Sequence, residues 1–110
     1  RMFNLNVRAP YILCRELAKK MVKNNWGRII NIGSTTSYSS ISIAPLYSAS
    51  KHAILGLSRA TCQDLSRYNV RVLFVSPGPV KSEMAKVVIG KFNENWDSFN
   101  DPVEIADYVA

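Results

Sequence analysis

The stretch RIINIG, residues 28–33, decides how this chain of 110 residues folds. It is short, rich in isoleucine and ended by glycine, which is typical of a β-strand. A second apolar run, VRVLFVS at residues 70–76, is typical of strands buried on both faces of a parallel sheet. More than thirty residues separate the two runs, which is enough for a helical crossover between parallel strands. The sequence therefore predicts a β-α-β unit and an α/β fold.

The crossover contains a predicted helix that begins near Pro45. Proline fits the first turn of a helix because an N–H at that point would have no partner within the helix. From Leu46 onward, apolar and small residues recur with a helical period, at positions 46, 49, 53, 54, 57, 60, 61 and 65. Tyr47 and Lys51 are i and i+4 on this helix, so they lie on one face of it.

Tyr47 and Lys51 form a pair that is suited to proton transfer. A phenol has a pKa of about 10, which is too high for easy proton exchange near neutral pH. A nearby ammonium group stabilises the phenolate and lowers that pKa. The pair therefore indicates general acid–base catalysis. The alternative is an ordinary exposed i,i+4 pair, since about one chain in five of this length contains Tyr-x-x-x-Lys by chance.

A long amphipathic helix is predicted over residues 2–23, and a glycine or asparagine in the following segment, residues 24–27, can provide a left-handed cap. Pro10 interrupts this helix because it has no N–H to donate to the carbonyl oxygen of Asn6. We expect a kink at that point and an Asn6 carbonyl oxygen that is free to bind a water or a side chain.

Polar residues follow both predicted strands. Ser34 comes directly after the first strand, and Pro77-Gly78-Pro79 comes directly after the second. In an open α/β sheet, ligands bind beyond the carboxyl ends of the strands. This edge is therefore the candidate binding site. The loop that Ser34 opens contains further serines that compete with it for a role there: Ser37, Ser39, Ser40 and Ser42.

In this combination of motifs the chain resembles the short-chain dehydrogenase/reductase family. Asn31-Ile32-Gly33-Ser34 is similar to the family's strand end, Asn-Ile-Ser-Ser, and Ser34 precedes Tyr47 by the family's interval of thirteen residues. Asn6 precedes Ser34 by twenty-eight residues, which matches the helix asparagine of the family. Residues 77–82 resemble the loop Pro-Gly-x-Val-x-Thr, which packs against the nicotinamide.

The resemblance implies a role for each matching residue. Tyr47 would protonate a carbonyl oxygen during reduction, and Lys51 would lower its pKa and bind the nicotinamide ribose. Ser34 would hydrogen-bond the substrate oxygen, beside Tyr47, and stabilise the charge that develops there. Asn6 would hold, through its main-chain carbonyl, a water that relays protons through the lysine. The implied contacts to the cofactor come from Tyr47, Lys51, Pro77, Gly78, Val80 and Ser82.

Two positions depart from the family pattern. Ser82 replaces the usual threonine but keeps the hydroxyl, so binding of the nicotinamide carboxamide remains implied. Leu73 stands where the family commonly has asparagine, so the family's structural polar contact at this position is not implied here, and no effect on the chemistry is expected. The residues that distinguish NAD from NADP would lie before Arg1, in the Gly-rich half of such a domain.

The resemblance further implies an NAD- or NADP-dependent oxidoreductase that interconverts a carbonyl and a secondary alcohol by hydride transfer. We expect residues 1–110 to be the catalytic half of a single Rossmann-type domain with a doubly wound parallel sheet, truncated at both ends and inactive alone. Its partners would be a small-molecule substrate and further copies of itself, as a dimer or tetramer. A second hypothesis is a catalytically silent relative that binds nucleotide and regulates a partner. The presence of Ser34, Tyr47 and Lys51 argues against that hypothesis.

The net charge of +6 raises nucleic-acid binding as a third hypothesis. However, the densest basic patch coincides with the end of the first predicted helix, where cations complement the helix dipole, and no nucleic-acid-binding motif accompanies it. No apolar run reaches the 18 residues of a membrane-spanning helix. Cys14 and Cys62 show no metal-ligand spacing and are typical of reduced thiols. We therefore expect a cytoplasmic protein with no metal, nucleic-acid or membrane partner.

Overall fold

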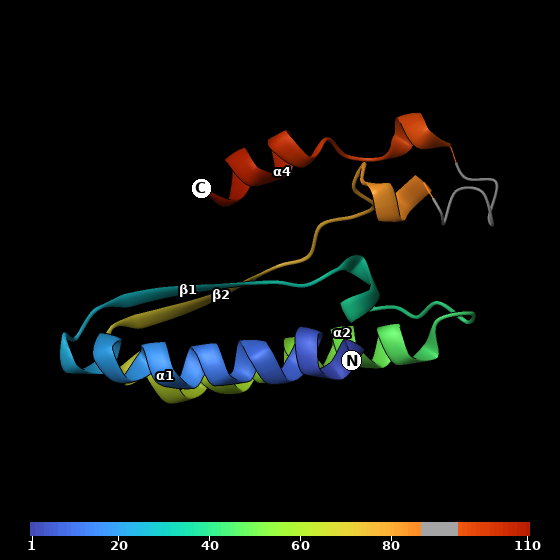
Figure 1. Ribbon diagram of the computed structural model, residues 1–110. Helices are drawn as coiled ribbons and strands as arrows, with labels where there is room; N and C mark the ends of the chain where they lie inside the picture. Colours follow the sequence, from blue (N-terminus) through green and yellow to red (C-terminus); the bar gives the residue numbers. More distant parts are fainter. Residues whose placement is uncertain (87–94) are drawn as a thin grey trace. The chain divides into compact units, whose positions relative to one another are not determined.

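The computed structural model describes residues 1–86 and 95–110 (Figure 1). By its internal contacts the chain divides into two compact units, Arg1–Ser76 and Pro77–Ala110. In the first unit the elements are, in order, the π-helical turn η1 (Asn4–Arg8), α1 (Ala9–Lys23), β1 (Gly27–Ile32), the 3₁₀ turn η2 (Thr35–Ser37), α2 (Pro45–Leu65), the 3₁₀ turn η3 (Ser66–Tyr68) and β2 (Val70–Val75). The second unit contains the 3₁₀ turn η4 (Trp96–Ser98) and α4 (Pro102–Val109).

The two strands form a parallel sheet, as the sequence predicts. Gly27 pairs with Val70 at one end of the sheet, and Ile32 pairs with Val75 at the other. Helix α2 connects the strands, and α1 and α2 both lie on the same side of the sheet (Figure 1). Both predicted strands are confirmed to within one residue at each end. The α/β fold class is confirmed, and the parallel pair corresponds to part of a Rossmann-type sheet.

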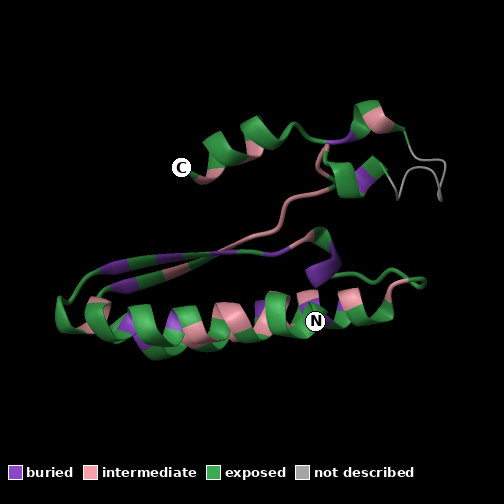
Figure 2. Cartoon of the chain, viewed as in Figure 1, coloured by how far each residue is buried: buried purple, intermediate pink, exposed green. Residues whose placement is uncertain are grey.

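The core of the first unit lies between the sheet and the two helices. Its buried residues come from α1, β1, α2 and β2: Cys14, Ala18, Ile29, Leu65 and Val70. Burial alternates strictly along β1, so every second side chain faces the helices (Figure 2). The expectation that the second strand is buried on both faces is not met within the described residues. Leu73 is 53% exposed, because α1 and α2 cover only one face.

The helical segment before β1 differs from the single long helix that the periodicity predicts. Residues Asn4–Arg8 are π-helical, and the N–H of Ala9 donates to the carbonyl of Asn4, five residues earlier. The α-helix begins at Ala9 and has Pro10 in its first turn, where proline's missing N–H costs little. The chain therefore accommodates Pro10 with a π-helical turn directly before it, a known form of helix irregularity. The left-handed cap is confirmed at Asn25, whose φ is 49°.

A chain of buried polar groups ties α1, β1 and α2 together. The Cys14 thiol donates to Asn31 Oδ1 over 3.8 Å, and Asn31 Nδ2 donates to Ser58 Oγ over 2.8 Å. Ser58 Oγ in turn donates to the carbonyl of Ile54 over 2.8 Å. Burial raises the pKa of Cys14, so the thiol stays neutral and acts as a donor. Because buried polar groups are costly to leave unpaired, these bonds add stability to the apolar packing between the helices and the sheet.

Among the residues that the structure describes, no helix has both the length and the apolar character needed to cross a membrane. Within the same residues, no group of three or more His, Cys, Asp and Glu side chains could hold a metal ion.

Candidate active site

Tyr47 and Lys51 lie in the first two turns of α2. Pro45 opens this helix, as predicted. The Lys51 ammonium is 5.6 Å from the centre of the Tyr47 ring, and both side chains are half-buried. Partial burial lowers the pKa of Lys51, because the charged amine loses contact with water. A partly desolvated cation interacts more strongly with a nearby oxygen or π-system than a fully solvated cation does. His52, the next residue, is exposed.

Ser34 follows β1 and is held by a reciprocal cap. Its Oγ accepts the N–H of Thr36 over 3.2 Å, and its own N–H donates to Ser37 Oγ over 3.2 Å. The Ser34 hydroxyl thus has one lone pair occupied and retains its proton for another acceptor. Ser37 is only 1% exposed and serves as the reciprocal member of the cap. Of the serines that competed with Ser34 in the sequence, Ser37 therefore has a structural role that needs no ligand.

Gly33 allows an aromatic ring to approach the end of β1 closely. Its N–H donates to the carbonyl of Val75 over 2.7 Å, which continues the ladder one residue past the strand. A Cβ at this position would overlap the ring of Phe74, whose own edge-to-face partner is Tyr38, with ring centres 6.4 Å apart. The ring and the backbone together fix the point from which Ser34 leaves the sheet.

The structure brings Asn6 to the Tyr47–Lys51 helix through Ser50. Asn6 Nδ2 donates to Ser50 Oγ over 3.3 Å, and Ser50 Oγ donates to the carbonyl of Tyr47 over 2.8 Å. Ser50 was not singled out from the sequence. The signal that could have found it is its position three residues after Tyr47, at helical spacings of four from Ile54 and eight from Ser58, which are also buried.

The second unit carries the other four predicted cofactor residues: Pro77, Gly78, Val80 and Ser82. Asn100 organises this loop, because its N–H donates to the Pro79 carbonyl over 2.8 Å and its own carbonyl accepts the N–H of Lys81 over 2.9 Å. Val80 pairs with Asn100 in an isolated parallel bridge. Ser82 Oγ accepts the N–H of Ala85 over 3.2 Å. The cofactor contacts of this unit stay a prediction.

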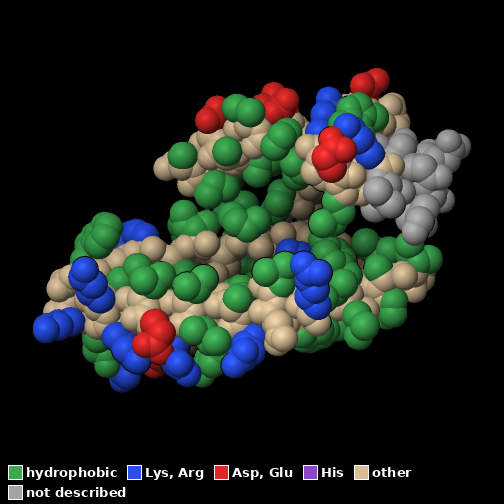
Figure 3. Space-filling view, viewed as in Figure 1, with side chains coloured by type: hydrophobic (Ala, Val, Ile, Leu, Met, Phe, Trp, Pro, Cys, Tyr) green, Lys and Arg blue, Asp and Glu red, His purple; other side chains and the backbone are tan. Residues whose placement is uncertain are grey.

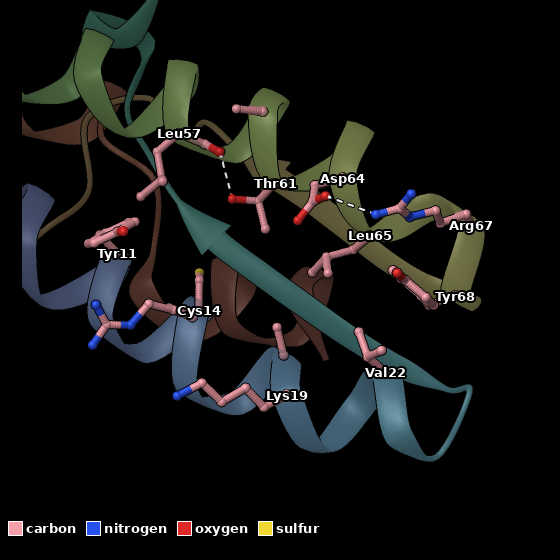
Figure 4. A pocket seen from close by; sticks show the side chains of 13 residues that line it. Tyr11, Cys14, Lys19, Val22, Leu57, Thr61, Asp64, Leu65, Arg67 and Tyr68 are labelled. Atoms are coloured by element: carbon pink, nitrogen blue, oxygen red, sulfur yellow. Dashed lines mark hydrogen bonds and ion pairs between the residues drawn. The ribbon is translucent and has the colours of Figure 1, made fainter.

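A separate groove of about 580 Å³ lies between α1 and α2 (Figure 4). Its walls include Cys14, Leu57 and Leu65, with an ion pair of 3.7 Å between Asp64 and Arg67 at one side. None of the predicted site residues lines it. The groove is therefore a feature of the helical surface, distinct from the Tyr47–Lys51 site.

Lys and Arg side chains gather over the last turns of α1 (Figure 3).

Comparison with known proteins gives one family. The family model described as short chain dehydrogenase matches residues 1–91. The uncharacterized oxidoreductase YgcW of Escherichia coli K12 is 42% identical over 77 residues, which is 70% of this chain and 30% of that protein. The 3-oxoacyl-[acyl-carrier-protein] reductase FabG of Rickettsia felis is 36% identical over a match of 116 aligned positions, which covers 100% of this chain and 48% of that protein.

Solved structures agree in fold. ElxO with NADP bound matches with a TM-score of 0.81 and 25% identity over 94% of this chain and 46% of that one. A 4-hydroxyisoleucine dehydrogenase complexed with NADH matches with a TM-score of 0.78 and 32% identity over 97% of this chain and 47% of that one. The chain thus spans between about a third and a half of the length of these relatives.

Gly33 offers a direct test of the packing beside Ser34. Gly33→Ala should lower the melting temperature of the full-length protein, because the new methyl group must displace Phe74, and overpacking of this kind costs about 1–3 kcal/mol. The matched control is Gly56→Ala in α2, where a Cβ meets nothing within 4 Å and alanine favours the helix by about 1 kcal/mol. A Gly33→Ala variant as stable as Gly56→Ala would contradict the close approach.

Proposed function

Because the chain belongs to the short-chain dehydrogenase family, we propose that residues 1–110 are the catalytic half of an NAD- or NADP-dependent oxidoreductase. Its reaction would interconvert a small-molecule carbonyl and a secondary alcohol. The observation that carries this proposal is the placement of the Lys51 ammonium 5.6 Å from the Tyr47 ring, at the start of the helix that crosses over from β1. Ser34, capped at the end of β1, adds a hydroxyl at the carboxyl edge of the sheet.

Ser34 and Tyr47 would both act on one substrate oxygen, and Lys51 would act on Tyr47. Ser34 donates a hydrogen bond from its hydroxyl to the carbonyl oxygen, keeps its proton, and stabilises the charge that develops on that oxygen. Tyr47 gives its phenolic proton to the same oxygen in reduction and takes it back in oxidation. Lys51 favours the phenolate that remains, since a positively charged ammonium group beside a phenolate lowers the energy of the phenolate. Asn6 supplies its main-chain carbonyl to a water that returns protons to this group.

The residues at this edge fit a polar cofactor. Ser76 Oγ, at the carboxyl end of β2, is buried and has no hydrogen-bond partner among the described residues. Lys51 has donor capacity for a ribose hydroxyl, and Tyr47 lies beside it. In the second unit, Pro77, Gly78, Val80 and Ser82 would hold the nicotinamide end. A nicotinamide held there would supply or accept the hydride.

The relatives support either form of the nicotinamide cofactor. ElxO was solved with NADP and the 4-hydroxyisoleucine dehydrogenase with NADH. The substrate class follows from what Ser34 and Tyr47 recognise, which is a single carbonyl or hydroxyl oxygen. The alternative, a relative that binds nucleotide without turnover, would leave the Tyr47–Lys51 pair with no proton to transfer.

We also propose that the protein assembles with copies of itself, as a dimer or tetramer, in the cytoplasm. Leu13 and Leu17 on α1 are 59% and 54% exposed, and the groove between α1 and α2 adds further apolar surface. Both cysteines are free thiols, in keeping with a reducing compartment. A monomer mass by light scattering, or secretion of the protein on cell fractionation, would contradict these assignments.

Replacement of Tyr47 tests the proposed reaction. In the full-length enzyme, Tyr47→Phe keeps the ring beside Lys51 but removes the proton, so kcat should fall by about 10²–10⁴-fold with cofactor affinity nearly unchanged. The matched control is Tyr38→Phe, because Tyr38 is 60% exposed and its side chain packs edge-to-face on Phe74 through the ring, which phenylalanine keeps. Tyr47→Phe with more than about a tenth of wild-type kcat would exclude Tyr47 as the principal acid. Wild-type protein that binds cofactor but turns over no carbonyl or alcohol would favour the regulatory alternative.

Replacement of Lys51 links activity to stability. Lys51→Met should weaken cofactor binding and shift the pH–rate profile of the residual activity to higher pH, because the cation no longer favours phenolate. Burial lowers the pKa of Lys51 in the folded state, so the charged lysine costs stability below that pKa and costs nothing once it is neutral in both states. Lys51→Met should therefore gain melting temperature relative to wild type at pH 7, and the gain should shrink as the pH rises toward 10. A gain that grows with pH would contradict this account.

A further inference from the structure

We propose that Ser50 is a positioning residue that sets the geometry of Tyr47 and Lys51 and couples it to the π-helical turn η1. The inference rests on the proposed function, because it concerns how that pair is held. Its basis is a chain of two hydrogen bonds, from Asn6 Nδ2 to Ser50 Oγ over 3.3 Å and from Ser50 Oγ to the Tyr47 carbonyl over 2.8 Å.

The Ser50 hydroxyl uses its only proton and one of its lone pairs in these two bonds. Ser50 is 0% exposed, so no solvent competes for its proton or its lone pairs. Its single proton goes to the Tyr47 carbonyl, and one lone pair accepts the Asn6 amide. A buried hydroxyl with both functions used is costly to disturb, because removal of either partner leaves a buried polar group unpaired.

The Tyr47 carbonyl is a sensitive place for this bond. In an α-helix the carbonyl of residue i accepts the N–H of residue i+4, so the carbonyl of Tyr47 is the one that faces the N–H of Lys51. The Ser50 hydroxyl adds a second bond to that same oxygen. Serine side chains that bond back to a preceding carbonyl adjust the local bend of a helix. Ser50 therefore acts on the single backbone turn that separates the phenol from the ammonium.

The π-helical turn supplies the other half of the contact. Asn6 is the middle residue of η1, and the bond that closes this turn runs from the Ala9 N–H to the Asn4 carbonyl. The Asn6–Ser50 bond spans 44 residues of sequence, so it joins two separate elements. π-helical turns are frequent at functional sites. Here η1 places the side-chain amide of Asn6 within hydrogen-bond distance of Ser50, in the part of α2 that carries Tyr47.

Ser58 provides a matched control on the same helix. It is also buried, at 3% exposure, and its hydroxyl donates to the Ile54 carbonyl over 2.8 Å. It also accepts an asparagine amide, from Asn31, over 2.8 Å. Ser58 thus repeats the hydrogen bonding of Ser50 about two turns further along α2, beyond Tyr47 and Lys51. If Ser50 had a purely structural role, replacing Ser50 and replacing Ser58 would have the same effects on stability and on kcat.

The test compares Ser50→Ala with Ser58→Ala in the full-length enzyme. Each variant leaves one asparagine amide unpaired, so both should melt a few degrees lower than wild type. Only Ser50→Ala should lower kcat, by at least about tenfold, and shift the pH–rate profile, with KM and cofactor affinity changed by less than about threefold. Equal losses of kcat in the two variants, or an unchanged kcat and pH profile in Ser50→Ala, would overturn the proposal.

Two further variants make the result specific. Asn6→Ala combined with Ser50→Ala should be no slower than the slower single variant, because residues that act through one contact are not additive. Additive losses would overturn the coupling to η1. If Ser50→Ala does not fold, Ser50→Cys keeps the volume and a weak donor and should give intermediate kcat. Wild type without turnover overturns the proposed function and this inference together, whereas active wild type with Ser50→Ala unaffected overturns only this inference.

Discussion

The apolar packing of α2 against the two parallel strands is the interaction on which the rest of this structure depends. Leu65 of α2 is buried there with Ile29 and Val70 of the strands, and the hydrogen bond from Asn31 to Ser58, over 2.8 Å, adds to this contact. Helix α2 is the crossover between the two parallel strands, so its position along the sheet fixes where its first turns lie relative to the carboxyl end of β1. Tyr47 and Lys51 are in those first turns, and Ser34 follows that strand end. The packing of α2 on the strands therefore sets the register in which the three groups are presented.

The same helix carries two kinds of environment along its length. Around Ser58, Ile54 and Leu65 the side chains are buried and pack against the sheet. Toward Pro45, Tyr47 and Lys51 are only half-buried. Stability comes from the first region and chemistry is proposed for the second, where partial burial lowers the pKa of Lys51 at some cost in stability.

Much of the fold follows from local rules, and the tertiary contacts do not. The strand boundaries, the start of α2 at Pro45 and the cap at Asn25 depend on residue types within a few positions, so the sequence predicts them. The π-helical form of residues 4–8 was not predicted, because Pro10 signals an irregularity but not the hydrogen-bond pattern that replaces it. The bond between Asn6 and Ser50 spans 44 residues, and patterns within a few positions of either residue do not indicate which distant side chain it meets. One face of β2 is exposed within the described residues, which an apolar run alone does not reveal.

The central claim is that Ser34 and Tyr47 act on one oxygen beside a nicotinamide that Lys51 helps to hold. A crystal structure of the full-length protein with the cofactor and a carbonyl-containing inhibitor tests it most directly. The account predicts a single inhibitor oxygen within about 3.2 Å of both Ser34 Oγ and Tyr47 Oη, with Lys51 Nζ on the nicotinamide ribose. An inhibitor oxygen bound by other groups, or a ribose out of reach of Lys51, would contradict it.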